Sequence, residues 1–136
     1  MAMSMAGSRA ARYAGVPRML AQPFEIERTN DLIVAAIRLE EIALHEAQEL
    51  VVELIERMRY ENARFFILDM SDVTTLVSDS LSGLITFAQD LECVHGRVAL
   101  ANCRPSVASV FQIAGLDTLF ALYDDVETAV EEVTGG

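Results

Sequence analysis

The run "FFILDM", residues 65–70, limits the fold more than any other part of the sequence. Five of its six residues are apolar and do not alternate with polar ones, which is typical of a parallel strand buried on both faces of a sheet. A parallel strand is joined to its neighbour by a long crossover, usually a helix. Strands and helices should therefore alternate along the chain, as they do in α/β proteins.

The segment before this run predicts a hairpin followed by a helix. Residues 24–27, "FEIE", alternate in the manner of an edge strand. After a turn, residues 32–39, "LIVAAIRL", predict a strand that is covered on both faces. Residues 43–60 place apolar side chains at intervals of three and four residues, which indicates a surface helix. The i,i+4 spacing of Glu53 and Arg57 adds a favourable ion pair on this helix.

The segment after the run continues the alternation, with proline and glycine at the element ends. Pro105 stands at the first position of a helix, and Gly96, Gly115 and Gly135 each stand where a helix should stop. We expect Asp124 to be the N-cap of the last helix. The predicted elements are a helix over 81–95, a strand over 97–102, a helix over 105–114, a strand over 119–124 and a helix over 124–133.

These elements predict one α/β domain. The order β-β-α-β-α-β-α-β-α implies a mostly parallel, mixed sheet with right-handed crossovers, in which only the first two strands form a hairpin. A chain of 136 residues is long enough to bury one hydrophobic core. We assign residues 21–136 to this domain. Residues 1–20 are rich in Met, Ala, Arg and Ser, and we expect either a disordered tail or a wrongly assigned start, with Met19 as the alternative first residue.

The charge of the chain is strongly negative and unevenly distributed. The net charge is −11, and all ten basic residues are arginine. Arg9, Arg12 and Arg18 lie in a segment without acidic residues, so removing their three charges leaves −14 for residues 19–136. Such a surface repels nucleic acid and anionic lipid, and it favours either a basic protein partner or simple solubility. With two cysteines, no export signal and no apolar run long enough to span a bilayer, we expect a cytoplasmic protein that does not insert into membranes.

Residue patterns that carry catalysis are scarce. No GxGxxG or GxxxxGK[ST] motif follows a predicted strand, so the usual phosphate cradles are missing. Asp69 and Asp72 follow the central strand, where we expect them to turn and cap the chain. We predict no enzyme activity, no cofactor, no catalytic residues and no metal. One alternative is a small enzyme or a metal site that uses Cys93, His95 and Cys103, for which no fourth ligand is evident.

The stretch "LVSDSLSGL", residues 76–84, opens the helix that follows the central strand. Any one of its first three polar residues could act as the N-cap, which contributes about 1 kcal/mol. One cap needs one side chain, and the stretch holds four polar residues. Its glycine costs about 1 kcal/mol in a helix relative to alanine, unless a backbone, a partner or tight packing lies close to it. The stretch is therefore either a cap or a site that a partner contacts: Ser78, Asp79, Ser80, Ser82 and Gly83.

The last 70 or so residues resemble a STAS domain, the fold of anti-sigma-factor antagonists. The similarity lies in the motif that opens the helix, in the "P-x-V…F-x-x-x-G-L" segment and in the acidic segment near the end, whereas the first half agrees in element order only. Three positions depart from the family motif: Val77 replaces Asp, Asp79 replaces Ser or Thr, and Ser80 replaces Gly. The ungapped match retains Val73, Leu76, Ser78, Leu81, Gly96, Pro105, Val107, Phe111, Gly115, Leu116, Phe120, Asp125, Glu127 and Ala129.

The resemblance implies a regulatory phosphoprotein in signal transduction and transcription regulation. Ser78 matches the serine that a partner anti-sigma factor, itself a serine kinase, phosphorylates, and Ser80 is the second choice. The unphosphorylated form would bind that partner, and phosphate would block the binding. The implied contact surface is Ser78, Asp79, Ser80, Ser82 and Gly83. The alternative is a STAS subunit without phosphorylation, in a stress-signalling assembly or a lipid-transport ABC complex, which the replacement of the motif Asp by Val77 favours.

Overall fold

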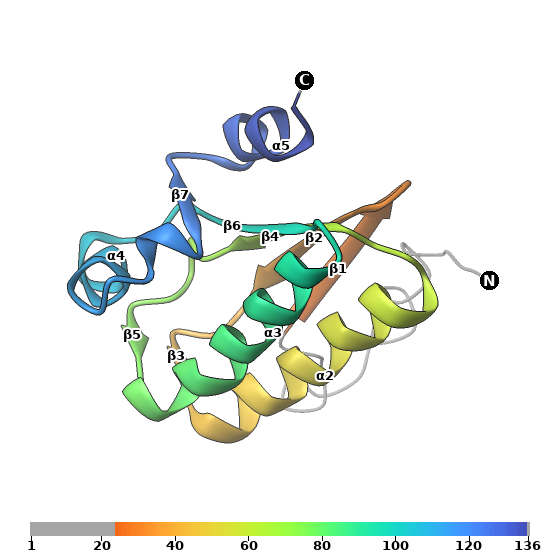
Figure 1. The fold of residues 1–136 in the computed structure, drawn as a ribbon. Helices are drawn as coiled ribbons and strands as arrows, with labels where there is room; N and C mark the ends of the chain where they lie inside the picture. The colour runs from red at the N-terminus through yellow and green to blue at the C-terminus, as the bar shows by residue number, and fades with distance from the viewer. Residues whose placement is uncertain (1–23, 136) are drawn as a thin grey trace, which may run out of the picture.

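The computed structural model describes residues 24–135, so the tail predicted for residues 1–20 lies outside the described part of the chain. The described elements alternate between strands and helices (Figure 1). In chain order they are β1 (Phe24–Thr29), β2 (Leu32–Ile37), β3 (Glu41–Ile42), α2 (Leu44–Tyr60), β4 (Phe65–Asp69), β5 (Thr75–Leu76), the 3-10 turn η2 (Ser78–Ser80), α3 (Leu81–Cys93), β6 (Arg97–Ala101), α4 (Pro105–Ile113), the 3-10 turn η3 (Leu116–Thr118), β7 (Ala121–Tyr123) and α5 (Val126–Thr134).

The main sheet has the predicted mixed topology. Its five strands lie in the order β1-β2-β4-β6-β7, and β1 pairs antiparallel with β2 while every other neighbouring pair is parallel. The run that forms β4 lies at the centre, as predicted. Phe66 and Leu68 are buried on one face of the sheet and Ile67 on the other. The predicted fold class is therefore confirmed.

Helices cover both faces of this sheet, but unequally. In Figure 1, α2 and α3 lie side by side on one face, and α5 lies on the other. Because α5 packs against β4, β6 and β7, it leaves the adjacent side of β2 partly uncovered. Ile33 and Ala35 are fully buried on the α2 and α3 side, whereas Leu32 and Val34 on the α5 side are only half-buried. The prediction that β2 is covered on both faces is thus correct for one face only.

A second sheet, too short to be predicted, joins the loops that precede α2 and α3. It consists of β3 and β5, which pair Glu41 with Thr75 and Ile42 with Leu76 in parallel register. The Glu40 carbonyl oxygen just before it accepts hydrogen bonds from the amides of Thr74 and Thr75, at 2.7 and 3.0 Å. Two residues per strand give no alternation to read, so sequence periodicity cannot reveal such a pair. The small sheet brings the first turns of α2 and α3 together at one end of the molecule.

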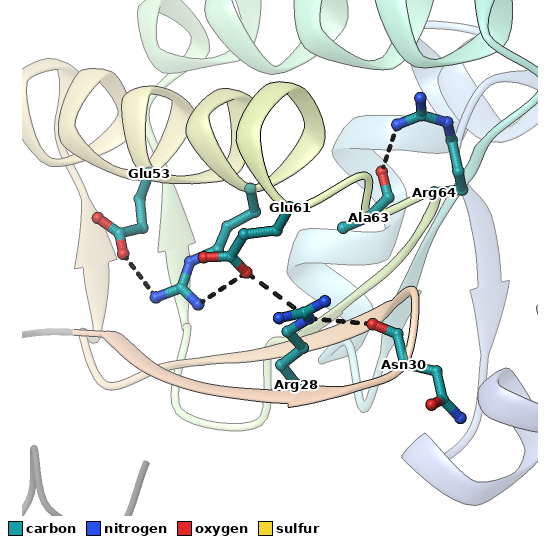
Figure 2. A network of polar contacts seen from close by, with 7 residues as sticks. Arg28, Asn30, Glu53, Glu61, Ala63 and Arg64 are labelled. Carbon is teal, nitrogen blue, oxygen red and sulfur yellow. Dashed lines mark hydrogen bonds and ion pairs between the residues drawn. The ribbon is translucent and has the colours of Figure 1, made fainter. Parts of the chain in front are cut away.

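The opposite end of α2 is held by a network of arginines and glutamates (Figure 2). The predicted pair is present, since Arg57 contacts Glu53 at 3.0 Å, and it also contacts Glu61 at 3.4 Å. Glu61 in turn contacts Arg28 of β1 at 3.7 Å. Arg64 donates to the carbonyl oxygens of Met58 and Ala63, both at 3.0 Å. These contacts fix the end of α2 to β1 and β4, far from the small sheet at its start.

Four helix ends show which residues take the left-handed and N-cap positions. Gly115 and Gly135 have left-handed φ values of 73° and 77°, as predicted for residues that end a helix. After α3, however, the left-handed residue is His95, with φ 64°, and not Gly96. The N-cap of α5 is Asp125 rather than the expected Asp124, because Asp125 has an extended backbone and its carboxylate accepts a hydrogen bond from the Thr128 amide at 2.7 Å.

The stabilisation that Asp125 gives α5 should be lost as the pH falls. The hydrogen bond from the Thr128 backbone amide is the main reason that the pKa of Asp125 lies below its ordinary value of 3.8. A lowered folded-state pKa contributes stability that is present above the unfolded-state pKa, about 3.9, and disappears as the pH drops through the folded value. Thermal unfolding should show the advantage of wild type over Asp125→Ala shrinking below about pH 4. The matched control is Asp124→Ala, for which an equal pH-dependent loss would contradict this assignment.

Candidate functional site

The predicted contact stretch forms the 3-10 turn η2 and the first turn of α3. Ser78 is the first residue of η2, and the turn lies beside the start of α2. The Val77 amide donates to the Ile42 carbonyl oxygen at 3.4 Å, and the Ser80 amide donates to the Val77 carbonyl oxygen at 2.9 Å. The turn is therefore bound by backbone to the small sheet and leads directly into α3.

Ser80 points into the protein. Its exposed fraction is 1%, and it is the only buried polar residue among those whose burial is described. Its hydroxyl lies 3.2 Å from the Ile42 carbonyl oxygen and closer still to that of Val77, so one proton is shared between two carbonyl acceptors. As the N-cap residue of α3 it makes no side-chain capping bond. In this conformation the Ser80 hydroxyl is not accessible to a kinase.

Asp79 and Ser82 lie at the surface beside this buried serine. Both are exposed, and the Ser82 hydroxyl donates to the Asp79 carbonyl oxygen at 3.4 Å. The Asp79 carboxylate therefore places a fixed negative charge next to Ser78 in the chain. The first turn of α3 holds no acidic residue of its own. Of the predicted contact residues, Asp79 and Ser82 thus face outward at the start of α3, whereas Ser80 does not.

Gly83 lies against the neighbouring helix. It is half-buried, and a Cβ built on it would lie 3.4 Å from Val51 Cγ2 of α2. Gly83 therefore lies where α3 packs against α2, but this packing does not require a glycine, because the methyl group of an alanine would make only ordinary contact with Val51.

The Gly83→Ala variant is expected to be more stable than wild type by about 0.5–1 kcal/mol, because alanine costs less than glycine in a helix. The new methyl group would make ordinary contact with Val51, so the gain should not be lost to strain. Urea unfolding followed by circular dichroism gives the difference. A clear destabilisation would show that α2 and α3 cannot adjust even to this contact.

Two aspartates lie at the carboxyl end of the central strand, Asp69 as its last residue and Asp72 in the turn that follows. Asp69 Oδ1 accepts hydrogen bonds from the Ser71 amide at 3.2 Å and from Asn102 Nδ2 at 3.1 Å. Asp72 contacts Arg38 at 3.5 Å. The Asp69 contacts agree with the expected turn, whereas the described contact of Asp72 is an ion pair with a distant residue and not a cap.

The cysteines and histidine considered as metal ligands do not come together. Within residues 24–135, no three His, Cys, Asp or Glu residues are grouped so that they could hold a metal ion. Cys93 is exposed at the end of α3, whereas Cys103 is partly buried after β6. Burial, with the negative charge of Asp69 as a second cause, raises the pKa of Cys103 to about 11. The alternative site built on Cys93, His95 and Cys103 is therefore not formed.

Native-state alkylation should distinguish the two thiols. At pH 8 about one Cys103 side chain in a thousand would be the reactive thiolate, given its pKa of about 11. We expect iodoacetamide to modify the exposed Cys93 at least about tenfold faster than Cys103, as followed by peptide mass spectrometry. In guanidinium the two rates should become similar. Equal rates in the native protein would contradict the burial of Cys103.

Comparison with known proteins identifies a family and a relative with similar sequences. Residues 24–129 match the STAS domain family. A Thermotoga neapolitana protein named as an anti-sigma factor antagonist, the TM1081 homolog, is 33% identical over 69 residues, which are 51% of this chain and 61% of that protein. The chain therefore matches less than two thirds of this relative's length. In the part of the chain described here, no helix is both long and apolar enough to cross a membrane.

Solved structures show the same fold at low sequence identity. The anti-sigma factor antagonist SpoIIAA in its unphosphorylated form has a TM-score of 0.71 and 23% identity, covering 83% of this chain and 97% of that one. The Bacillus cell fate determinant SpoIIAA in its phosphorylated form has a TM-score of 0.64 and 22% identity, covering 81% and 98%. This chain belongs to the STAS domain family, because the family match covers residues 24–129 and the element order and mixed sheet agree with it.

Proposed function

We propose that this STAS protein regulates by binding a protein partner, an anti-sigma factor that is also a serine kinase, and that phosphorylation of Ser78 weakens the binding. It would act in the cytoplasm and by binding rather than by catalysis. The observation that carries the proposal is the position of Ser78 at the start of η2, which would correspond to the family's phosphoacceptor in an ungapped match. The second choice, Ser80, is buried and hydrogen-bonded. The existence of SpoIIAA in both phosphorylation states supports the same reading.

The electrostatics of the turn support a switch that acts on the partner. A phosphoserine adds about −1.5 to −2 charges. The start of α3 tolerates that charge, because a helix N-terminus favours anions and the first turn of α3 holds no acidic residue. The added charge would lie close to the exposed Asp79, so it would reinforce an existing negative surface. The cost would therefore fall on a partner that brings an acidic group close to this turn, because like charges repel.

A second function is favoured by Asp79 itself. Because its carboxylate is permanent and exposed, a partner already tolerates a negative charge beside Ser78. Such a chain could be a constitutive STAS subunit of a stress-signalling assembly or of a lipid-transport ABC complex. It would retain its partner whether or not Ser78 is modified.

Phosphosite mapping combined with affinity capture distinguishes the phosphorylation switch from the constitutive subunit. Tagged wild type, Ser78→Ala and Ser82→Ala are incubated with ATP and native lysate of the source organism, and captured proteins and phosphopeptides are identified by mass spectrometry. The switch predicts phosphate on Ser78 in wild type and Ser82→Ala, and capture of a protein with a kinase-type ATP-binding domain. Unmodified Ser78 together with capture of a transporter or assembly subunit would support the constitutive function instead.

A further inference from the structure

The hydroxyl of Ser80 joins two segments that lie far apart in the sequence. It reaches the Ile42 carbonyl oxygen at 3.2 Å, across 38 positions, and also contacts the Val77 carbonyl oxygen three positions before it. A buried hydroxyl is costly unless it is hydrogen-bonded, and alanine or glycine would fill a buried position of this size without that cost. The serine therefore contributes a bond, and the bond ties η2 to the end of β3.

The backbone joins the small sheet firmly up to β5 but more loosely at the turn itself. The Val77 amide, just before η2, reaches the Ile42 carbonyl oxygen at 3.4 Å, a long hydrogen bond, so the Ser80 hydroxyl supplies the shorter of these two links to Ile42. Ile42 immediately precedes Ala43, the N-cap residue of α2, whose amide donates to Glu46 Oε1 at 3.0 Å. Through Ile42, the hydroxyl therefore couples the first turn of α3 to the first turn of α2.

We propose that Ser80 is a positioning residue, which holds the turn that carries Ser78 in one conformation before a partner arrives. The effect of Ser80 on partner binding rests on the function proposed above. Its effect on the conformation of the turn does not, because that effect exists in the protein without a partner. Binding to an ordered turn avoids the cost of ordering it in the complex. Phosphate on Ser78 would then act by its charge on a surface already in place, and not by folding or melting the turn.

Hydrogen exchange of the free protein tests the tie directly. In Ser80→Ala the amides of Val77 and Ser80 should exchange about tenfold faster than in wild type, since the net contribution of such bonds is of that order. The Ile42 and Val77 carbonyls each keep a backbone donor, so this variant leaves neither buried acceptor without a partner. Amides of β4 and α5 should exchange at unchanged rates. Ser80→Gly, which carries the family's residue, is the second hydroxyl-free variant.

The matched control is Ser82→Ala, which removes an exposed hydroxyl bonded to Asp79 in the same segment. It should leave exchange at Val77 and Ser80 within about twofold of wild type. Rates within that range in both Ser80 variants would overturn the proposal. So would an equal increase at every amide, because that would report a lower global stability and no local role.

Binding kinetics give a readout that a merely stabilising residue would not produce. In Ser80→Ala the association rate with the captured partner should fall in proportion to the population of the ordered turn, by at most about tenfold, while the dissociation rate stays unchanged. A change confined to dissociation would overturn the positioning role. Failure of wild type to bind any partner would overturn the proposed function only, and the exchange experiment would still decide the role of Ser80.

Discussion

Replacing Gly96 with alanine is expected to lower the free energy of unfolding by about 3 kcal/mol and the Tm by about 10 °C. A Cβ at this position would lie 2.4 Å from Leu91 Cδ1 and 2.6 Å from the Arg64 carbonyl oxygen. Leu91 is fully buried, and the Arg64 carbonyl accepts a hydrogen bond from the Arg97 amide at 2.8 Å, where β4 meets β6. Neither group can withdraw without disturbing the core or the start of the strand pairing.

Urea unfolding followed by circular dichroism measures this loss, and Gly83→Ala is its matched control. The same methyl group is added in both variants, but at position 83 it meets only Val51, at 3.4 Å. The two substitutions should therefore change stability in opposite directions. If Gly96→Ala were as stable as wild type, the close approach of Gly96 to the Arg64 carbonyl would not hold in solution.

The Ser78→Glu variant is expected to bind the partner about tenfold to a hundredfold more weakly than wild type. The new carboxylate adds to the exposed charge of Asp79, and an acidic group on the partner several ångströms away would repel both. A partly screened interaction of this kind costs on the order of 1–3 kcal/mol. Titration calorimetry at two salt concentrations measures the loss, which should shrink as the salt concentration rises.

Gln89→Glu serves as the control for charge alone. Gln89 is exposed on α3, away from η2, so the same added charge should change the affinity by less than about threefold. An unchanged affinity of Ser78→Glu would contradict the switch and favour the constitutive subunit. An equal loss in both variants would mean that the partner reads the overall charge of the protein and not this turn.

The main sheet could be predicted because its signals are long. The apolar run at 65–70 and the helical spacing of residues 43–60 persist over several residues, so they survive local exceptions. The pair of β3 and β5 has no such signal, since its two-residue strands are fixed by contacts between distant segments. The N-cap of α5 was misplaced by one residue because "DD" offers two equivalent candidates. Only the backbone conformation shows that Asp125 takes the role.

The candidate site could be located from the sequence but not oriented. The polar stretch and the family motif indicated where α3 begins and which serine to test. Sequence reasoning could not show that Ser80 turns inward, because its acceptor on Ile42 lies 38 residues away. For Gly83 it left a partner contact and tight packing open, and the ordinary contact distance to Val51 shows that packing against α2 does not require a glycine. Inward-facing polar residues depend on tertiary contacts, which a local pattern does not contain.

The order of the strands in the main sheet also has a consequence for synthesis on the ribosome. After the hairpin, β2, β4, β6 and β7 follow one another in space as they do in the chain, so each new strand can join an edge that already exists. The face that holds Ile67, Ala99 and Ala101 is different, because it is covered by α5, which is made after the strands of the sheet. A nascent chain that ends before Val126 would therefore present a nearly finished sheet with one bare apolar side, and this is the stage at which it would most need a chaperone.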